Sequence, residues 1–345
     1  MSCGPVLHLF AWERKFALPF RDFIHRHFAD GRHQFIVYGD VVESDVPVSS
    51  DTRIMSGILR NFVPITREIN KAERIIIHGL FDSHLFYLLA IQPWLLKKCY
   101  WVMWGGDLYV HNVPKRDWRS KKNEFFRRFI VKRIGHLITY IKGDFELAKK
   151  WYGVKGQYHH CLMYPSNLYH GLTLPSKRGG AISILVGNSA DPTNNHVEMF
   201  EKLIEYKNEN IHILCPLSYG PADHAAHIEQ VGKQLFKDKF TPLLDFLPFD
   251  EYLRLLGEVD IAVFAHKRQQ AMGNTIKLLG LGKKVYMRPD VTPWKVFIEL
   301  GVKVFDISEL SLDPIDDAEK ENNIHAIKRA FCETVLIDQY SDIFR

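Results

Sequence analysis

Short apolar runs alternate with longer helical segments along most of the chain, and this alternation constrains the fold more than any other feature. The apolar runs form two series, which lie at residues 6–10, 35–38, 75–78, 99–103 and 137–141, and at 182–186, 211–215, 261–264 and 285–287. Buried parallel strands have this short, continuous apolar pattern, and the helices between them form the crossovers. The sequence therefore predicts an α/β protein of two Rossmann-like domains whose parallel sheets face a central cleft.

A stretch rich in proline, glycine and serine separates the two series at residues 164–180. Such a composition is typical of a connection between domains. The chain has 345 residues, of which 46% are hydrophobic, and this is enough for two hydrophobic cores. We predict a first domain over 1–168, a linker over 169–180, a second domain over 181–322, and a C-terminal helical segment over 323–345 that could pack back on the first domain.

The charge of the chain is divided unevenly between its two halves. Residues 1–175 contain 25 Lys and Arg against 15 Asp and Glu, whereas residues 176–345 contain 20 against 25. Nine of the basic residues lie between 115 and 133, where aromatic residues are interleaved with them. We therefore expect the two domains to meet different partners.

The segment 115–133 resembles a helix that lies on a membrane surface. Its aromatic and aliphatic residues could gather on one side, with Lys and Arg covering the rest; they are Trp118, Phe125, Phe126, Phe129 and Ile130. This pattern suits anionic lipid headgroups. The residues predicted to bind the membrane or the acceptor are Lys115, Arg116, Trp118, Arg119, Lys121, Lys122, Arg127 and Arg128.

The alternative for this segment is an ordinary amphipathic helix with its aromatics in the core and its charges solvated. We expect no nucleic-acid partner, because no RNA- or DNA-binding motif accompanies the charge. No stretch approaches the roughly 18 uninterrupted apolar residues of a membrane span. The first eight residues also lack the features of a secretory signal. We expect the protein to contact a membrane only at its surface.

In the second series, the run 182–186 ends abruptly at Gly187, which small polar residues follow. Gly187 permits a tight turn, and Asn194 or Asn195 could cap the next helix. Free backbone N–H groups at such a helix start favour a phosphate, and polar side chains such as Asn188 could bind the rest of a nucleotide. The alternative is a capped connection without a ligand.

A second polar loop follows the run 261–264 and contains Lys267 and Arg268. Arg268 could stabilise the charge that develops on a departing nucleoside diphosphate. Gln269 and Gln270 could bind sugar hydroxyls. The alternative, a solvated basic turn, fits less well because four long polar residues follow a buried strand almost directly.

Two polar residues of the first domain stand at strand ends, where α/β folds gather their ligand-binding groups. His78 ends the run 75–78, and Asp107 follows the run 99–103 after two glycines. Either side chain could take a proton from an attacking hydroxyl group. The alternatives are a core histidine with satisfied hydrogen bonds and an aspartate that caps a helix.

Four motifs together carry a family resemblance, and they are WGGDLY at 104–109, ILVGNSAD at 184–191, FDEYLRLL at 249–256 and RQQAMG at 268–273. They resemble glycosyltransferase family 56, the TDP-N-acetylfucosamine:lipid II N-acetylfucosaminyltransferases, also named 4-α-L-fucosyltransferases. The combination of the four in this order is specific, whereas each motif alone is weak.

The resemblance implies a GT-B fold, a donor in which dTDP carries 4-acetamido-4,6-dideoxygalactose (Fuc4NAc), and an acceptor saccharide on undecaprenyl diphosphate. It implies a peripheral enzyme at the cytoplasmic face of the bacterial inner membrane, in the synthesis of enterobacterial common antigen, O-antigen or capsule. With the loop analysis, it predicts Asp107, His78 and Arg268 as catalytic residues. The predicted donor-binding residues are Gly187, Asn188, Ser189, Asp191, Tyr219, Lys267, Gln269, Gln270, Gly273 and Asn274.

The sequence departs from the family pattern at several positions. Ala190 and Ala271 replace glycines, and Asn274 stands where threonine is usual. The E-x7-E signature of many retaining GT-B enzymes is absent from 266–280, so the stereochemical outcome stays open. No D-x-D metal motif is present, and we expect no metal and no cofactor besides the nucleotide sugar. A non-catalytic nucleotide-sugar-binding protein and a sugar-nucleotide epimerase or hydrolase are the alternative functions.

Overall fold

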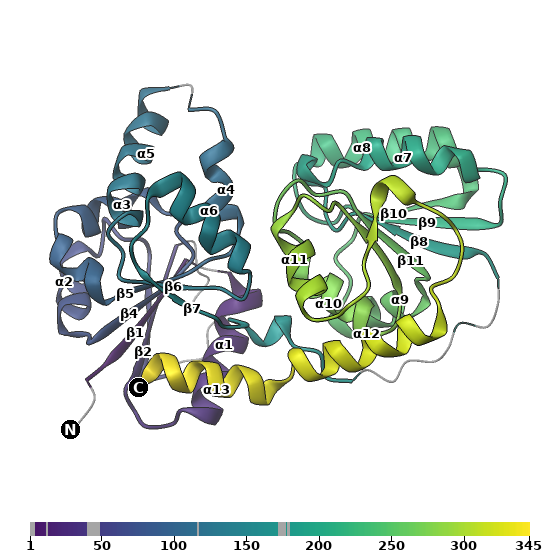
Figure 1. The fold of residues 1–345 in the computed structure, drawn as a ribbon. Coiled ribbons are helices and arrows are strands. Elements are labelled where there is room, and N and C mark those ends of the chain that lie inside the picture. The colour runs from purple at the N-terminus through teal and green to yellow at the C-terminus, as the bar shows by residue number, and fades with distance from the viewer. Residues whose placement is uncertain (1–3, 12, 40–48, 116, 172–176, 178–179) are drawn as a thin grey trace. The chain divides into compact units, whose positions relative to one another are not determined.

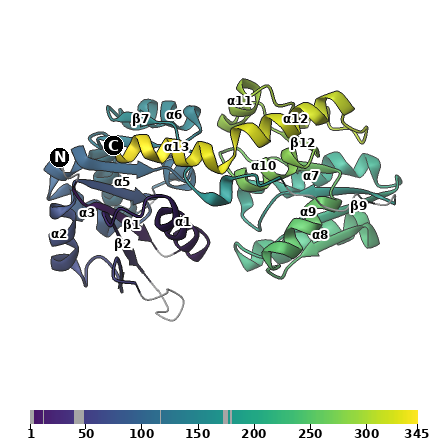
Figure 2. The same cartoon turned by 90° about the horizontal axis from the view of Figure 1, so that it is seen from below.

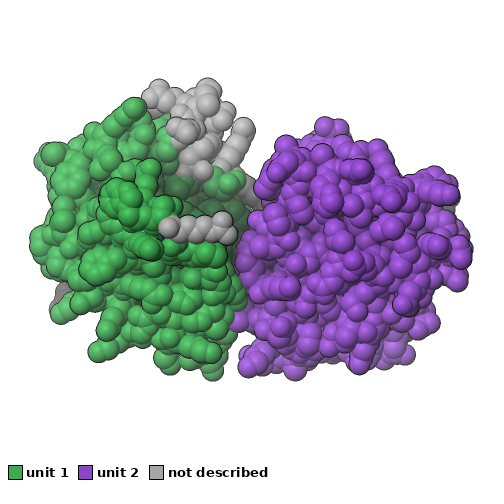
Figure 3. Space-filling model, turned by 90° about the horizontal axis from the view of Figure 1, so that it is seen from above, with its two compact units in different colours: residues 1–167, 333–345 green, residues 168–332 purple. Residues whose placement is uncertain are grey.

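The structure, a computed structural model, describes residues 4–11, 13–39, 49–115, 117–171, 177 and 180–345. The chain divides into two compact units, one of residues 1–167 and 333–345 and the other of residues 168–332 (Figure 3). Each unit contains one parallel β-sheet with helices packed on it (Figure 1). The prediction of two Rossmann-like α/β domains is confirmed.

The first sheet has seven strands in the order β3-β2-β1-β4-β5-β6-β7, and all of its strand pairs are parallel. The strands are β1 Val6–Ala11, β2 His33–Tyr38, β3 Thr52–Met55, β4 Arg74–His78, β5 Cys99–Val102, β6 His136–Ile138 and β7 Gln157–His159. Each predicted apolar run of this half overlaps a strand, although the run 137–141 extends three residues beyond β6. The sequence does not reveal β3 and β7, because both are short and carry half-buried or exposed polar residues.

Helices cover both faces of this sheet, and they are α1 Arg14–His27, α2 Phe62–Lys71, α3 Ser83–Ala90, α4 Gly106–Tyr109, α5 Trp118–Val131, α6 Lys142–Tyr152 and α13 Glu333–Phe344. The main core lies on one face and includes Leu9, Ile77 and Trp101. On the other face α1 packs against α13, where the rings of Phe20 and Tyr340 are 5.4 Å apart (Figures 1 and 2). Alternate residues of β1 point to these two faces.

The second sheet has six strands in the order β10-β9-β8-β11-β12-β13, again with parallel pairs. The strands are β8 Ile182–Val186, β9 Ile211–Pro216, β10 Phe240–Leu243, β11 Ile261–Phe264, β12 Lys284–Met287 and β13 Phe305–Asp306. Its helices are α7 His196–Leu203, α8 Ala222–Phe236, α9 Phe249–Glu258, α10 Met272–Gly280, α11 Thr292–Glu299 and α12 Asp317–Ala330. The sequence does not reveal the edge strands, because β10 contains Pro242 and β13 has two residues.

The ends of the predicted domains differ from those of the observed units. The predicted C-terminal segment 323–345 is divided, because α12 packs on α10 in the second unit whereas α13 belongs to the first. The predicted linker 169–180 starts inside the second unit. There the buried Tyr169 donates its backbone N–H to Phe331 O (2.8 Å) and its hydroxyl to Gly280 O (2.7 Å). Linker residues 172–176 and 178–179 lie outside the described residues.

A chain of hydrogen bonds joins three histidines on the α1 and α13 side of the first sheet. His33, His8 and His78 are linked in this order by N···N distances of 3.0 and 3.2 Å, and His78 Nδ1 lies 2.7 Å from the Tyr164 hydroxyl. Trp104 Nε1 is 2.7 Å from the same hydroxyl oxygen. Each contact in the chain from His33 to Tyr164 joins groups that can donate or accept, so neutral rings that all donate in the same direction along the chain satisfy every contact.

The three imidazoles are therefore neutral members of the core. Burial lowers the pKa of His78 well below its ordinary value. Burial, followed by the neighbouring histidines, does the same for His8, and burial lowers the pKa of His33 to about 4. Both ring nitrogens of His78 are used inside the unit. The geometry thus favours the alternative of a satisfied core histidine over the predicted catalytic role of His78.

The turn after β5 is held by the carboxylate of Asp107. Its Oδ2 accepts hydrogen bonds from Trp101 Nε1 (2.6 Å) and Leu80 N (3.0 Å), and its Oδ1 accepts one from Trp104 N (2.9 Å). The buried guanidinium of Arg127 donates to the backbone carbonyls of Asp107 and Leu80. Asp107 is fully buried. This argues against its predicted role as a base, because an acceptor hydroxyl could not reach it, and favours a structural role that joins β5, the loop after β4 and α5.

We predict that acid destabilises the protein partly through the histidine chain. In the unfolded chain these histidines are protonated below about pH 6.5, whereas His33 in the folded unit stays neutral down to about pH 4. Unfolding therefore takes up protons, and its free energy falls as the pH drops through this window, by about 1.4 kcal/mol per pH unit for each proton.

The variant His33→Asn keeps an amide group near the Nδ1 position that bonds His8 and removes one titrating ring, so its unfolding free energy should fall less steeply between pH 6.5 and 4. Urea unfolding at several pH values measures the slopes. His227→Asn is the matched control, because His227 is exposed. Equal slopes for H33N and the wild type would contradict the account.

The variant Asp107→Asn should destabilise the turn after β5. An amide can present only one acceptor oxygen, so at least one buried N–H of Leu80, Trp101 or Trp104 would lose its partner. We expect a loss of about 1–3 kcal/mol in the free energy of unfolding. The control Asp338→Asn changes an exposed aspartate in α13 and should have little effect. A D107N protein as stable as the wild type would show that the carboxylate does not hold this turn.

Candidate functional site

The candidate site lies where the strand order of the second sheet reverses. β9 and β10 extend from one side of β8, and the chain then returns to place β11 on the other side of β8. The loops that leave β8 and β11 consequently start next to each other and run in opposite directions. Open α/β sheets bind ligands at this point of reversal, outside the carboxyl ends of the strands. The two polar loops predicted from the sequence are therefore neighbours.

Gly187 makes the turn that ends β8, with φ at +71°. A Cβ atom at this position would lie 2.6 Å from His196 Nε2 and 2.9 Å from Asn194 Oδ1. Both the backbone conformation and the contacts therefore require glycine. The space left by the missing side chain lets the Asn194 amide reach the strand end.

Asn194 connects the loops after β8 and β11. Its Oδ1 accepts hydrogen bonds from Asn188 N (2.9 Å) and His266 Nε2 (2.8 Å), and its Nδ2 donates to Ser189 Oγ (3.1 Å) and Asp191 O (2.9 Å). The sequence suggested Asn194 or Asn195 as a cap of α7. Asn195 occupies the cap position, but neither side chain caps the helix.

Predicted donor-binding residues from three loops form one hydrogen-bond network. Asn188 Nδ2 donates to the Tyr219 hydroxyl (2.6 Å), and Gln270 Nε2 donates to Asn188 Oδ1 (3.2 Å). Thr193 Oγ1 lies within hydrogen-bonding distance of Gln270 Oε1 (2.8 Å) and Asp191 Oδ1 (2.5 Å), and its single proton can be donated to either oxygen. The structure thus brings together Asn188, Asp191, Tyr219 and Gln270, which are far apart in the sequence.

Arg268 supplies a positive charge next to this network. Its Nη2 lies 3.6 Å from Asp191 Oδ2, and its side chain is partly exposed. Burial alone would raise the pKa of Asp191, but hydrogen bonds from Thr193 and the charge of Arg268 outweigh burial and hold this pKa below its ordinary value. The long contact leaves most of the hydrogen-bonding capacity of the guanidinium available to an anionic ligand.

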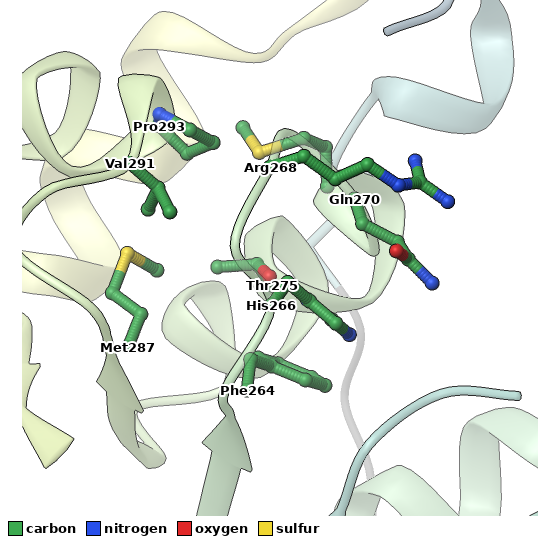
Figure 4. Close-up of a pocket in the computed structure, with 9 residues that line it drawn as sticks. Phe264, His266, Arg268, Gln270, Thr275, Met287, Val291 and Pro293 are labelled. Atoms are coloured by element: carbon green, nitrogen blue, oxygen red, sulfur yellow. The ribbon is translucent and has the colours of Figure 1, made fainter. Parts of the chain in front are cut away.

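A pocket opens between the loop after β11, the first turn of α10 and the loop after β12 (Figure 4). Its lining residues are Phe264, His266, Arg268, Gln270, Met272, Thr275, Met287, Val291 and Pro293. Ala271 precedes α10 with φ at +56°, a conformation that glycine adopts more readily. The N-terminus of this nine-residue helix faces the same region as Arg268, so both favour a negative charge there.

The remaining predicted donor residues are placed around this pocket in different ways. Gln269 is buried, and its Oε1 has no hydrogen-bond partner among the described residues. Lys267 is exposed beside Arg268. Gly273 and Asn274 lie in the first turn of α10, but the Asn274 amide donates to the Tyr252 hydroxyl of α9 (2.9 Å).

In the first unit, α5 differs from both interpretations of its sequence. Trp118 and Phe125 are 73% and 66% exposed and share a face with Lys121 and Lys122. We call these four residues the aromatic-basic stripe. The Lys122 ammonium lies 5.1 Å from the centre of the Trp118 ring.

Other residues of the predicted membrane-binding set have different positions. Arg127 is buried and bonded to backbone carbonyls, so its prediction as a membrane contact is wrong. Lys115 donates to the carbonyl of Val113 (2.5 Å). Arg128 pairs with Glu124 (2.9 Å), while Arg119 is exposed. Arg116 lies outside the described residues. Phe126, Phe129 and Ile130 pack toward the core.

Among the residues that the structure describes, no group of three or more His, Cys, Asp or Glu side chains is arranged to hold a metal ion. None of the described helices is long and apolar enough to span a bilayer.

Solved structures with the same fold include glycosyltransferases. A glycosyltransferase from Rickettsia africae is 12% identical with a TM-score of 0.67, and the match covers 100% of this chain and 98% of that one. Anabaena Alr3699/HepE in complex with UDP is 10% identical with a TM-score of 0.67, over 98% and 99% of the two chains. WaaG, a glycosyltransferase involved in lipopolysaccharide biosynthesis, is 14% identical with a TM-score of 0.56, over 98% and 93%. These likenesses establish a GT-B type fold.

The family model that describes the 4-alpha-L-fucosyltransferases of glycosyl transferase group 56 matches residues 23–343, nearly the whole chain. The resemblance carried by the four sequence motifs is therefore confirmed. The chain belongs to glycosyltransferase group 56.

Proposed function

We propose that the protein transfers a Fuc4NAc-type sugar from a dTDP-linked donor to a saccharide carried on undecaprenyl diphosphate, in the synthesis of a bacterial surface polysaccharide. The observation that carries this proposal is the polar network of three loops beside Arg268, at the strand reversal of a group 56 glycosyltransferase. Amide and hydroxyl groups from Asn188, Tyr219 and Gln270 supply the directional contacts that a nucleotide sugar requires.

The diphosphate of the donor would lie beside Arg268 and the N-terminus of α10. As the glycosidic bond breaks, negative charge develops on the departing nucleoside diphosphate, and fixed positive groups stabilise it. We propose that these protein groups do so without a required metal ion. Transfer should then continue in the presence of EDTA.

The lipid-linked acceptor places the reaction at a membrane surface, and the aromatic-basic stripe of α5 suits that surface. Aromatic rings that lie among lysines can insert at the headgroup level, while the cations attract anionic lipid. We therefore propose peripheral attachment to the cytoplasmic face of the inner membrane through Trp118, Lys121, Lys122 and Phe125.

Arg268→Ala tests the function and the role of this side chain together. We expect the wild type to release dTDP from dTDP-Fuc4NAc only when an undecaprenyl-diphosphate-linked saccharide is present, and R268A to reduce kcat about 100-fold. The fold should persist, because the described contacts of Arg268 are a hydrogen bond to Gln269 O (3.2 Å) and the 3.6 Å ion pair with Asp191. The control Arg254→Ala removes an exposed arginine of α9.

Three outcomes would contradict this proposal. Release of dTDP without a lipid acceptor would identify a hydrolase or epimerase. Binding of the nucleotide sugar without turnover of any acceptor would identify a binding protein. Full turnover by a folded R268A protein would remove the assigned role of Arg268.

The membrane prediction is tested by the double variant Trp118→Ser, Phe125→Ser. Sedimentation with vesicles of phosphatidylcholine and phosphatidylglycerol should show at least about tenfold weaker binding than the wild type, because two exposed aromatic groups are lost. The control Trp94→Ser removes another exposed tryptophan outside the stripe. Unchanged binding of the double variant, or wild-type binding that does not depend on phosphatidylglycerol, would contradict the assignment.

A further inference from the structure

His266 is a buried polar residue that lines the pocket, and the proposed function assigns no role to it. It lies two residues after the end of β11, is 4% exposed, and its ring stacks on Phe264 with centroids 5.5 Å apart. Figure 4 shows the imidazole in the pocket wall together with Phe264 and Thr275. Its one hydrogen bond among the described residues joins Nε2 to Asn194 Oδ1 at 2.8 Å.

The surroundings of Asn194 determine which nitrogen of His266 carries the proton. Asn188 N can only donate, so the Asn194 atom 2.9 Å from it is the oxygen. The Asp191 carbonyl can only accept, so the atom 2.9 Å from it is the amide nitrogen. The amide orientation is thus fixed by two backbone groups. His266 must donate to this oxygen from Nε2, and its Nδ1 therefore bears a lone pair.

The Nδ1 lone pair persists at every pH at which the protein would work. Burial, followed by the charges of Arg268 and His196, lowers the pKa of His266 to about 3. No described group donates to Nδ1, and this nitrogen is not one of the buried polar atoms that lack a partner, so it is open to the pocket. A ligand in the pocket can therefore supply its hydrogen-bond partner.

The chemistry of Nδ1 selects that partner. A lone pair cannot bind a phosphate oxygen, because neither atom carries a proton at neutral pH, and it repels a ring or carbonyl oxygen as well. It accepts from a hydroxyl group or from the N–H of an acetamido group. Arg268 and the start of α10, which suit the diphosphate, line the same pocket, so the sugar attached to that diphosphate is within reach.

We propose that His266 is a specificity-determining residue that accepts a hydrogen bond at Nδ1 from a hydroxyl or acetamido N–H of the donor sugar, and that Asn194 is the positioning residue that fixes its tautomer. This inference rests on the proposed function, since it assumes a nucleotide sugar in the pocket. It goes further in assigning a sugar contact, separate from the diphosphate and nucleoside contacts, to one nitrogen atom.

Two substitutions separate the two ring nitrogens. The amide of His266→Gln overlays Nε2 and can keep the hydrogen bond to Asn194, but it leaves no acceptor at the Nδ1 position. The amide of His266→Asn overlays Nδ1 and keeps an acceptor there, but it does not reach Asn194. The control His212→Gln makes the same change in β9, where His212 pairs with Thr241 away from the pocket.

Calorimetry with dTDP and with dTDP-Fuc4NAc measures the contribution of the sugar as the ratio of the two dissociation constants. We expect H266Q to bind dTDP like the wild type but dTDP-Fuc4NAc about tenfold or more weakly. H266N should recover most of that loss, and H212Q should change neither constant. Weaker binding of dTDP and of the nucleotide sugar by the same factor in H266Q, or no change in either, would overturn the inference.

A spectroscopic measurement on the wild type covers the case in which a variant fails to fold. In protein labelled with ¹⁵N-histidine, His266 should show a protonated Nε2 and a bare Nδ1, and dTDP-Fuc4NAc but not dTDP should shift the Nδ1 resonance. A protonated Nδ1, or a shift that dTDP alone reproduces, would overturn the inference. Wild-type protein that binds neither probe would overturn the proposed function and this inference together, whereas binding with an unaffected H266Q overturns the inference alone.

Discussion

The parallel pairing of β11 with β8 is the constraint on which the candidate site depends. It brings the end of β11 beside the turn at Gly187, although the two are separated by two strands and three helices in the chain. The Asn194 amide then joins both loops in the space that a side chain at position 187 would fill. Backbone pairing and a missing Cβ thus position the polar groups before any ligand contributes.

The first sheet has the same reversal of strand order, because β1 lies between β2 and β4. The polar residues at its strand ends, however, form hydrogen bonds inside the core. His8 and His78 belong to a buried hydrogen-bond chain, and Asp107 satisfies three N–H groups. The two units therefore use one architecture for different purposes. In the second unit, polar side chains line a pocket, while in the first unit they hold turns and the core.

The fold could be predicted from the sequence to a large extent, because buried parallel strands such as β8 and β11 are short apolar runs that need no partner to be recognised. Edge strands such as β10 were not predicted, because their half-exposed positions do not form a continuous apolar run. The loops after β8 and β11 were also predictable as polar segments at strand ends. Their hydrogen-bond partners were not.

Burial explains most of the differences between the roles predicted for the candidate residues and the positions that they occupy in the structure. Arg127 and Asp107 have the residue types of a membrane contact and a catalytic base, but both are enclosed by elements distant in sequence. Asn194 shows the opposite case, because an asparagine before a helix suggests a cap. Its role as a bridge to His266 depends on the pairing of β8 with β11, which no local pattern contains.

The central claim is that the pocket beside Arg268 binds a nucleoside diphosphate, and thermal unfolding with saturating dTDP, UDP, GDP or CDP tests it most directly. A ligand at 100 times its dissociation constant stabilises the folded state by about 2.7 kcal/mol, so Tm should rise by several degrees. We expect the largest rise with dTDP. A larger rise with another nucleotide would replace the proposed donor, and no rise with any of the four would contradict the assignment of the site.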